Sequence, residues 1–250
     1  MKLFFKKILY PFYFFLLRYS RNFDLLPKPQ IKICISSTRN YAAKTLPLLI
    51  KSLTESGISG NDIYVFEGGH PSKEYVFESF HHYLVAHNSI DFTALIEVAH
   101  IEFETCYWFF LHDTCIVGKD FKRLIENIPH FMPDTLPIKD YPSMNIGAYK
   151  HTYLKEKEEL LQRYINKSAN QASLLEFKEK GVQDEDILFR QSKNPFVYNG
   201  WKLLKDNSYK RDDVAIPDIY TNRVCEYFPQ VALYKFKANY HLELTNVLEL

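Results

Sequence analysis

The sequence lacks the glycine pattern of the common nucleotide-binding loops. It has eight glycines in 250 residues, and the polar stretch "SSTRNYAAK" after the first apolar run contains none. Neither GxGxxG nor GxxxxGK[ST] follows that run, so a dinucleotide-binding loop and a P-loop are disfavoured. A nucleotide bound here would need side chains and a metal ion to contact its phosphates.

Cysteine is scarce, and the net charge is close to zero. The four cysteines show no CxxC pair and no close metal-ligand spacing, which we interpret as reduced thiols of a cytoplasmic protein. The 31 Lys and Arg residues nearly balance the 30 Asp and Glu residues. No overall field therefore draws the protein to nucleic acid, and we expect no nucleic-acid partner.

Long apolar runs are missing as well. Residues 1–30 mix Lys and Arg with aromatic residues, and the longest uncharged stretch, Ile8 to Leu17, has Pro11 inside it. A spanning helix needs about 20 apolar residues. The segment fits a basic, aromatic helix in the membrane interface, with peripheral contact through residues 1–25 at the inner face of a membrane. A helix packed on the domain fits equally well.

Strand and helix signals alternate after the linker "PKPQ". Apolar runs at Ile31–Ile35, Ile63–Phe66 and Tyr107–Leu111, and a shorter run in "HYLVAHN", predict four strands. Helical spacing follows the first strand, and helices are also predicted for about Ser72 to His82 and for "DFTALIEVAHIEFE". This order predicts an α/β fold in residues 31–250, with a mostly parallel central sheet flanked by helices.

Polar side chains follow three of these strands where each one ends. In a parallel sheet these ends share one edge, and ligands bind outside it. The sequence therefore predicts a site at this edge, built from residues of three separate loops: Ser36, Ser37, Thr38 and Arg39; Glu67, Gly68 and Gly69; His112, Asp113 and Thr114.

The segments "IKICISSTRN", "LPLLIKSLTESGISGNDIYVFEGG", "YWFFLHDTCIVGKDF", "PSMNIGAYK" and "GVQDEDILFR" resemble, in order and spacing, a nucleotide-sugar glycosyltransferase of the GT-A type. The resemblance covers about Ile31 to Arg190. It implies one GT-A-like, Rossmann-like domain that transfers a sugar from a nucleoside diphosphate sugar to a glycan or lipid-linked acceptor. It also implies nucleotide binding by the first loops, through Ser36, Ser37, Thr38, Arg39 and Glu67.

The family usually has an Asp-x-Asp motif where this sequence has His112, Asp113 and Thr114. The resemblance implies that these residues hold Mn²⁺ or Mg²⁺ on the diphosphate, and it suggests His241 as a further ligand. A mixed oxygen and nitrogen set suits Mn²⁺ better than Mg²⁺. Which of the three motif residues contacts the metal stays open. In the alternative interpretation, Asp113 caps the following turn and His112 packs against the sheet.

An inverting transfer also needs a base for the acceptor hydroxyl. "GVQDEDILFR" provides Asp184, Glu185 and Asp186, and it resembles the segment that supplies the base in several GT-A branches. Asp184 or Glu185 is the first choice. Acidic residues in a first helical turn are also favoured by the helix dipole alone. Two other functions stay open: a metal-dependent hydrolase that uses His112 and Asp113, and a binding module without catalytic activity.

Overall fold

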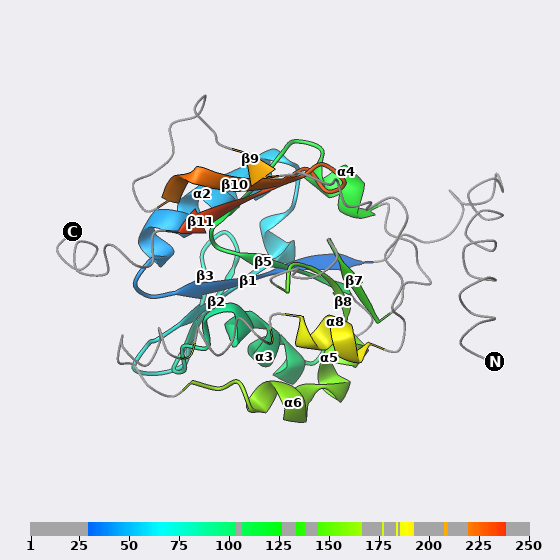
Figure 1. Cartoon of the computed structure of the whole chain (residues 1–250). Helices are drawn as coiled ribbons and strands as arrows, with labels where there is room; N and C mark the ends of the chain where they lie inside the picture. Colours follow the sequence, from blue (N-terminus) through cyan, green and yellow to red (C-terminus); the bar gives the residue numbers. More distant parts are fainter. Residues whose placement is uncertain are drawn as a thin grey trace, which may run out of the picture.

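A computed structural model describes residues 30–103, 107–126, 134–138, 145–166, 177, 184, 186–192, 208–209 and 220–238. Its centre is a seven-stranded sheet in the order β3-β4-β2-β1-β5-β8-β7 (Figure 1). The strands are β1 (Ile31–Thr38), β2 (Ile63–Gly68), β3 (Glu74–Phe77), β4 (His81–Val85), β5 (Tyr107–His112), β7 (Thr135–Pro137) and β8 (Gly147–Lys150).

Five of the seven strands run in one direction. β4, β2, β1 and β5 pair in parallel, while β3 and β8 pair antiparallel with this block. β7 pairs antiparallel with β8 and so returns to the direction of β5. The predicted α/β class with a mostly parallel central sheet is therefore confirmed, and the carboxyl ends of the middle strands share one edge.

The middle strands are buried on both faces. Alternate residues of β1 pack into two separate cores: Ile33 and Ile35 lie in one, and Cys34 lies in the other. β2 and β5 are buried along their whole length. Strands covered on both faces read as continuous apolar runs, because both sets of alternating side chains leave water. That is why these strands were visible in the sequence.

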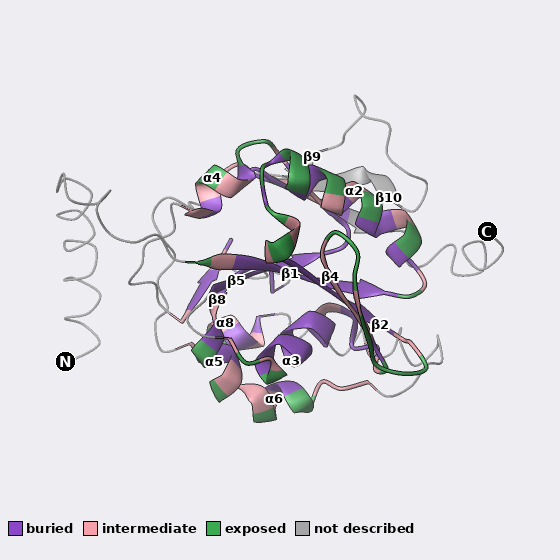
Figure 2. Ribbon diagram, turned by 180° about the vertical axis from the view of Figure 1, so that it is seen from behind, coloured by how far each residue is buried: buried purple, intermediate pink, exposed green. Residues whose placement is uncertain are grey.

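Helices cover the two faces of the sheet differently. The first face is covered by α2 (Ala42–Glu55), which buries one side and exposes the other; the second carries α3 (Thr93–His100), buried on nearly its whole surface (Figure 2). α3 packs against the sheet and also against two further helices, which explains its complete burial. The other helices in the described part of the chain are η2 (Gly60–Asp62), η3 (Ile90–Phe92), α4 (Phe121–Glu126), α5 (His151–Glu156), α6 (Glu158–Gln162) and α8 (Ile187–Gln191).

A second sheet lies over the α2 face, in the order β6-β11-β10-β9. Its strands are antiparallel, and Leu233, Val231 and Phe228 from the β10–β11 hairpin share a core with α2 and β1. β6 follows β5 after a two-residue turn and so links the sheets. The bounds are β6 (Cys115–Val117), β9 (Ser208–Tyr209), β10 (Tyr220–Phe228) and β11 (Leu233–Ala238).

The helix predicted for about Ser72 to His82 is wrong. The chain forms the β3–β4 hairpin there, and β4 pairs in parallel with β2. Three of the four residues of β3 and two of the five residues of β4 are Tyr, Phe or Val. Such residues favour strands once a neighbouring edge is available for pairing. Pairing with a distant strand thus decided the structure of this segment.

The predicted boundary between residues 1–30 and 31–250 stays a prediction, because the described residues begin at Gln30. Among the described helices, none combines the length and the apolar character needed to cross a bilayer.

Candidate functional site

The three predicted strand ends meet at one edge of the central sheet. Ser36 of β1 pairs with His112 of β5, and Ser37 pairs with Glu67 of β2. The backbone N–H of Arg39 donates to Gly68 O at 2.9 Å, which joins the two following loops. The structure therefore brings together the loops that the sequence pointed to.

His112 faces the α3 side of this edge. Its Nδ1 lies 3.3 Å from Oδ1 of Asp91 in η3, and only 6% of His112 is exposed. Ser36 Oγ accepts the N–H of Ala94 at 2.9 Å and donates to Asp91 O at 3.2 Å. Ser36 and His112 thus fix the start of α3 against the sheet.

Asp113 faces the α2 side instead. Its Oδ2 accepts hydrogen bonds from Ser37 Oγ at 2.7 Å and from Thr45 Oγ1 of α2 at 2.9 Å. Burial raises the pKa of Asp113 above its ordinary value, although these hydroxyl donors and the charge of Lys235 oppose that shift. Asp113 therefore holds β1, β5 and α2 together at the site edge.

Thr114 is tied to the second sheet. Its backbone O accepts the N–H of Phe236 at 3.0 Å, and its Oγ1 accepts a hydrogen bond from Nζ of Lys235. Lys235 also donates to Phe236 O at 3.1 Å. Strand β11 thus places an ammonium group on the last residue of the HDT motif.

The three motif residues, as arranged, do not fit a divalent cation. His112 and Asp113 point to opposite faces of the sheet, as consecutive residues at a strand end do. Thr114 Oγ1 already contacts an ammonium group, which would repel a second cation at the same oxygen. Within the part of the chain that is described, no three His, Cys, Asp or Glu side chains form a metal-binding group. His241 lies outside the described residues, so its predicted metal contact stays a prediction.

Glu67 is held between two histidines at the end of β2. Its Oε1 lies 2.6 Å from Nε2 of His70, and its Oε2 lies 3.0 Å from Nε2 of His82. Burial alone raises the pKa of Glu67, but hydrogen bonds and charge from the histidines outweigh burial and hold this pKa below its ordinary value. The predicted nucleotide-binding carboxylate therefore already has partners on both oxygens.

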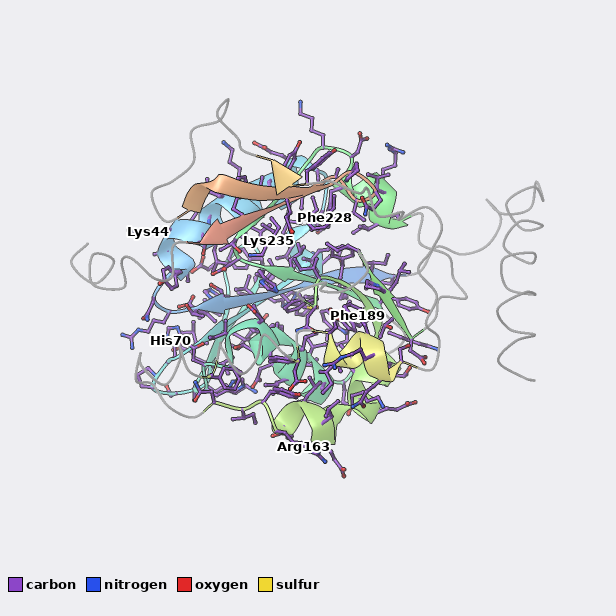
Figure 3. All side chains as sticks on the ribbon, in the orientation of Figure 1. Lys44, His70, Arg163, Phe189, Phe228 and Lys235 are labelled. Carbon is purple, nitrogen blue, oxygen red and sulfur yellow. The ribbon has the colours of Figure 1, made fainter. Side chains whose placement is uncertain are left out.

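Two cations at this edge have no carboxylate partner. Arg39 is exposed beside the end of β1, and Lys44 is half-buried in the first turn of α2. Neither forms an ion pair with any residue that the structure describes. Figure 3 shows Lys44 and His70 on the side toward which β1 points. The edge therefore combines internally bonded carboxylates with unneutralised positive charge, which attracts an anionic ligand.

The predicted acidic segment lies on the α3 side. Asp184 accepts hydrogen bonds from Tyr164 OH at 2.9 Å and Arg190 Nη2 at 3.1 Å, and 39% of its side chain is exposed. Asp186, at the start of α8, is only 3% exposed. Tyr164 stacks on Phe92 of η3, next to the partner of His112. Glu185 lies outside the described residues.

Asn145 is a feature that sequence reasoning missed. It lies just before β8, is fully buried and has a left-handed φ of 59°. Neither amide atom has a hydrogen-bond partner among the residues that the structure describes. Gly147, two residues on, permits a close backbone approach: a Cβ there would lie 2.3 Å from Leu136 O. The orphaned amide depends on packing and left no sequence signal.

Lys235 was missed as well, although a signal existed. It lies two positions after Leu233, which belongs to the core between the sheets, so both side chains share one face of β11. A lysine on the inward face of a strand is unusual, because burying an ammonium group costs free energy. The alternation therefore indicated an inward cation.

No protein-family profile and no curated protein matches the chain. Among solved structures it resembles TarS residues 1–349 from S. aureus, with a TM-score of 0.31 and 10% identity over 52% of this chain and 49% of that one. It also resembles the apo-form glycosyltransferase GlyE from Streptococcus pneumoniae TIGR4, with a TM-score of 0.40 and 10% identity over 70% of this chain and 46% of that one. The chain thus matches about half the length of each, and the α/β class rests on its own sheet topology.

Proposed function

We propose that this protein is a glycosyltransferase that moves a sugar from a nucleoside diphosphate sugar to a hydroxyl of a glycan or lipid-linked acceptor. The observation that carries the proposal is the edge where β1, β2 and β5 end together. Its carboxylates are bonded within the protein, whereas Arg39 and Lys44 have no carboxylate partner among the described residues. An anionic ligand at the carboxyl end of a parallel sheet suits this arrangement.

The donor diphosphate would contact the cations that follow β1. The N-terminus of the 14-residue helix α2 lies beside the same loop, and a helix N-terminus favours negative charge. During transfer the bond between the anomeric carbon and the phosphate oxygen breaks, and its electron pair stays on that oxygen. Nearby positive charge stabilises the departing diphosphate.

For an inverting transfer, the acceptor oxygen bonds to the anomeric carbon while its proton passes to a carboxylate. Of the two described acids in the predicted segment, Asp184 is the accessible one, and Asp186 is buried. Tyr164 and Arg190 hold the carboxylate of Asp184 in place. We therefore favour Asp184 as the base, with Glu185 as the second choice.

The test is donor turnover by the full chain. A panel of nucleoside diphosphate sugars, with and without Mn²⁺, is offered with glycan and lipid-linked acceptors, and nucleoside diphosphate release is measured. We expect one donor to be consumed. Asp184→Asn or Glu185→Gln should then lower turnover by about a hundredfold while donor binding persists.

Asp120→Asn is the matched control, because Asp120 is exposed and pairs with Arg123 away from the predicted site. If turnover is unchanged in both Asp184→Asn and Glu185→Gln, neither residue is the general base. Binding of a donor without turnover would favour a binding module. A chain that binds none of these donors is not a glycosyltransferase of this type.

A further inference from the structure

Lys235 brings a positive charge to the HDT motif, which stands where the resembling family has DxD. Strand β11 pairs antiparallel with β6, so that Lys235 lies opposite Cys115, the residue after the motif. Its Nζ donates to the side chain of Thr114, and the backbone of Phe236 bonds to the same threonine. In Figure 3, Lys235 lies between the second sheet and the central sheet.

The contacts of Lys235 leave its charge intact. Both oxygens that accept hydrogen bonds from its Nζ are neutral, one a hydroxyl and the other a backbone carbonyl. No carboxylate among the described residues lies within ion-pair distance of this Nζ. The charge of Lys235 still opposes the rise in the pKa of Asp113, without an ion pair between them. An ammonium group has three donors, and among the described residues two of them have acceptors. A half-buried cation whose hydrogen bonds go to neutral oxygens is stabilised when an anion joins it.

The same position works against a divalent cation. The ammonium occupies Thr114 Oγ1, while Asp113 accepts hydrogen bonds from Ser37 and Thr45. His112 lies on the other face, against Asp91. The motif thus keeps the position of a DxD but directs its three side chains to three different partners.

We propose that Lys235 supplies the positive charge that a divalent cation supplies in a DxD-type site, and that the chain binds the diphosphate of its donor without a metal ion. The proposal rests on the proposed function. Arg39 and Lys44 lie at the same edge and add charge for the same diphosphate. In transfer, the ammonium group stabilises the electron pair that remains on the phosphate oxygen when the sugar leaves.

The experiment is calorimetric titration of the full chain with uridine, guanosine, cytidine, adenosine and thymidine diphosphates. Each titration is done in EDTA and again in Mn²⁺. We expect one diphosphate to bind with the same affinity, within about twofold, in both conditions. Lys235→Met, which removes the charge but keeps most of the side chain, should weaken that binding by about tenfold or more. Affinity for the matching nucleoside, which lacks phosphate, should stay the same.

Lys235→Arg should restore most of the affinity, because it returns the charge. Lys51→Met is the matched control, since Lys51 is exposed at the far end of α2. Binding that requires Mn²⁺ would overturn the Lys235 proposal and leave the glycosyltransferase proposal standing. The same holds if Lys235→Met binds as the wild type does. If no diphosphate binds in either condition, both proposals fail. If Lys235→Met does not fold, the comparison of EDTA with Mn²⁺ in the wild type still tests whether the diphosphate binds without a metal ion, and a need for Mn²⁺ overturns the proposal.

Discussion

Glu67 and Asp113 are two buried carboxylates at one sheet edge, on the two strands that flank β1, and their pKa values move in opposite directions. Both residues are buried, Glu67 with 7% of its surface exposed and Asp113 with 6%, and burial raises the pKa of both carboxylates. Glu67 contacts two histidines and has a lowered pKa. Asp113 contacts two hydroxyls and has a raised pKa.

Burial is the largest influence on both carboxylates and raises both pKa values; the histidines outweigh it at Glu67, whereas the hydroxyls do not outweigh it at Asp113. A histidine can carry a proton and offset the cost of burying the anion, whereas a hydroxyl offers only a dipole. Both carboxylates form hydrogen bonds within the protein at this edge of the sheet. Arg39, Lys44 and Lys235 form no ion pair with any carboxylate that the structure describes.

Replacement of Glu67 should have the largest effect. In Glu67→Gln the amide nitrogen becomes a donor that faces a histidine. The negative charge of the carboxylate, which contacts His70 and His82, is lost. We expect the free energy of unfolding to fall by about 2 to 4 kcal/mol at neutral pH, as when one partner of a buried pair is removed. Urea denaturation followed by circular dichroism measures it.

The control is Glu55→Gln, because Glu55 is largely exposed and its pair with Lys51 spans 3.9 Å. Exposed pairs contribute roughly 0 to 1 kcal/mol, so this variant should stay near the wild type. Equal losses in the two variants would refute the view that the histidines stabilise ionised Glu67.

Replacement of Asp113 by asparagine should have a smaller effect. The amide oxygen still accepts from Ser37 and Thr45, and the buried charge is removed. We expect a loss of no more than about 1 kcal/mol in the free energy of unfolding. Asp113→Ala removes the acceptor from both hydroxyls and should cost about 2 kcal/mol. Both losses are read from urea denaturation curves. If asparagine were as damaging as alanine, the charge of Asp113 would matter more than its acceptor oxygen.

The shared edge was predictable from sequence because its signals are local. Each apolar run ends in polar residues, and parallel pairing then brings Ser36, Glu67 and His112 together. The partners of the motif were not predictable, since they come from packing of distant segments. Thr45 and Asp113 are 68 positions apart, and Thr114 and Lys235 are 121 apart.

The β3–β4 hairpin also depends on contacts between segments that are distant in sequence. Its residues look helical or extended depending on what lies beside them, and pairing of β4 with β2 decided the outcome. β8 was different, because Gly147 is a glycine where the backbone of β7 comes close: a Cβ there would lie 2.3 Å from Leu136 O. Local chemistry was readable in the sequence, while contacts between layers required the structure.

The smallest expected effect is a difference in pH dependence between the two carboxylates. The pKa of Glu67 in the folded state lies below the ordinary value of 4.5, so its stabilisation is present above that pH and is lost as pH falls through the folded pKa. The stability gap between wild type and Glu67→Gln should therefore narrow on acidification. Only the part of the Glu67 contribution to the free energy of unfolding that depends on its protonation varies with pH. The variation of the gap with pH should therefore be smaller than the loss caused by Glu67→Gln itself.

Asp113 should give the opposite sign. Its folded pKa lies above the ordinary value of 3.8, so the folded state binds the proton more tightly than the unfolded state. The wild type should lose stability relative to Asp113→Asn as pH rises from 3.8 through the folded pKa. Urea denaturation of the wild type and both variants at several values between about pH 3 and 7 measures the two gaps. If the stability differences between the wild type and the two variants change in the same direction with pH, hydroxyl and histidine partners act alike on these two carboxylates.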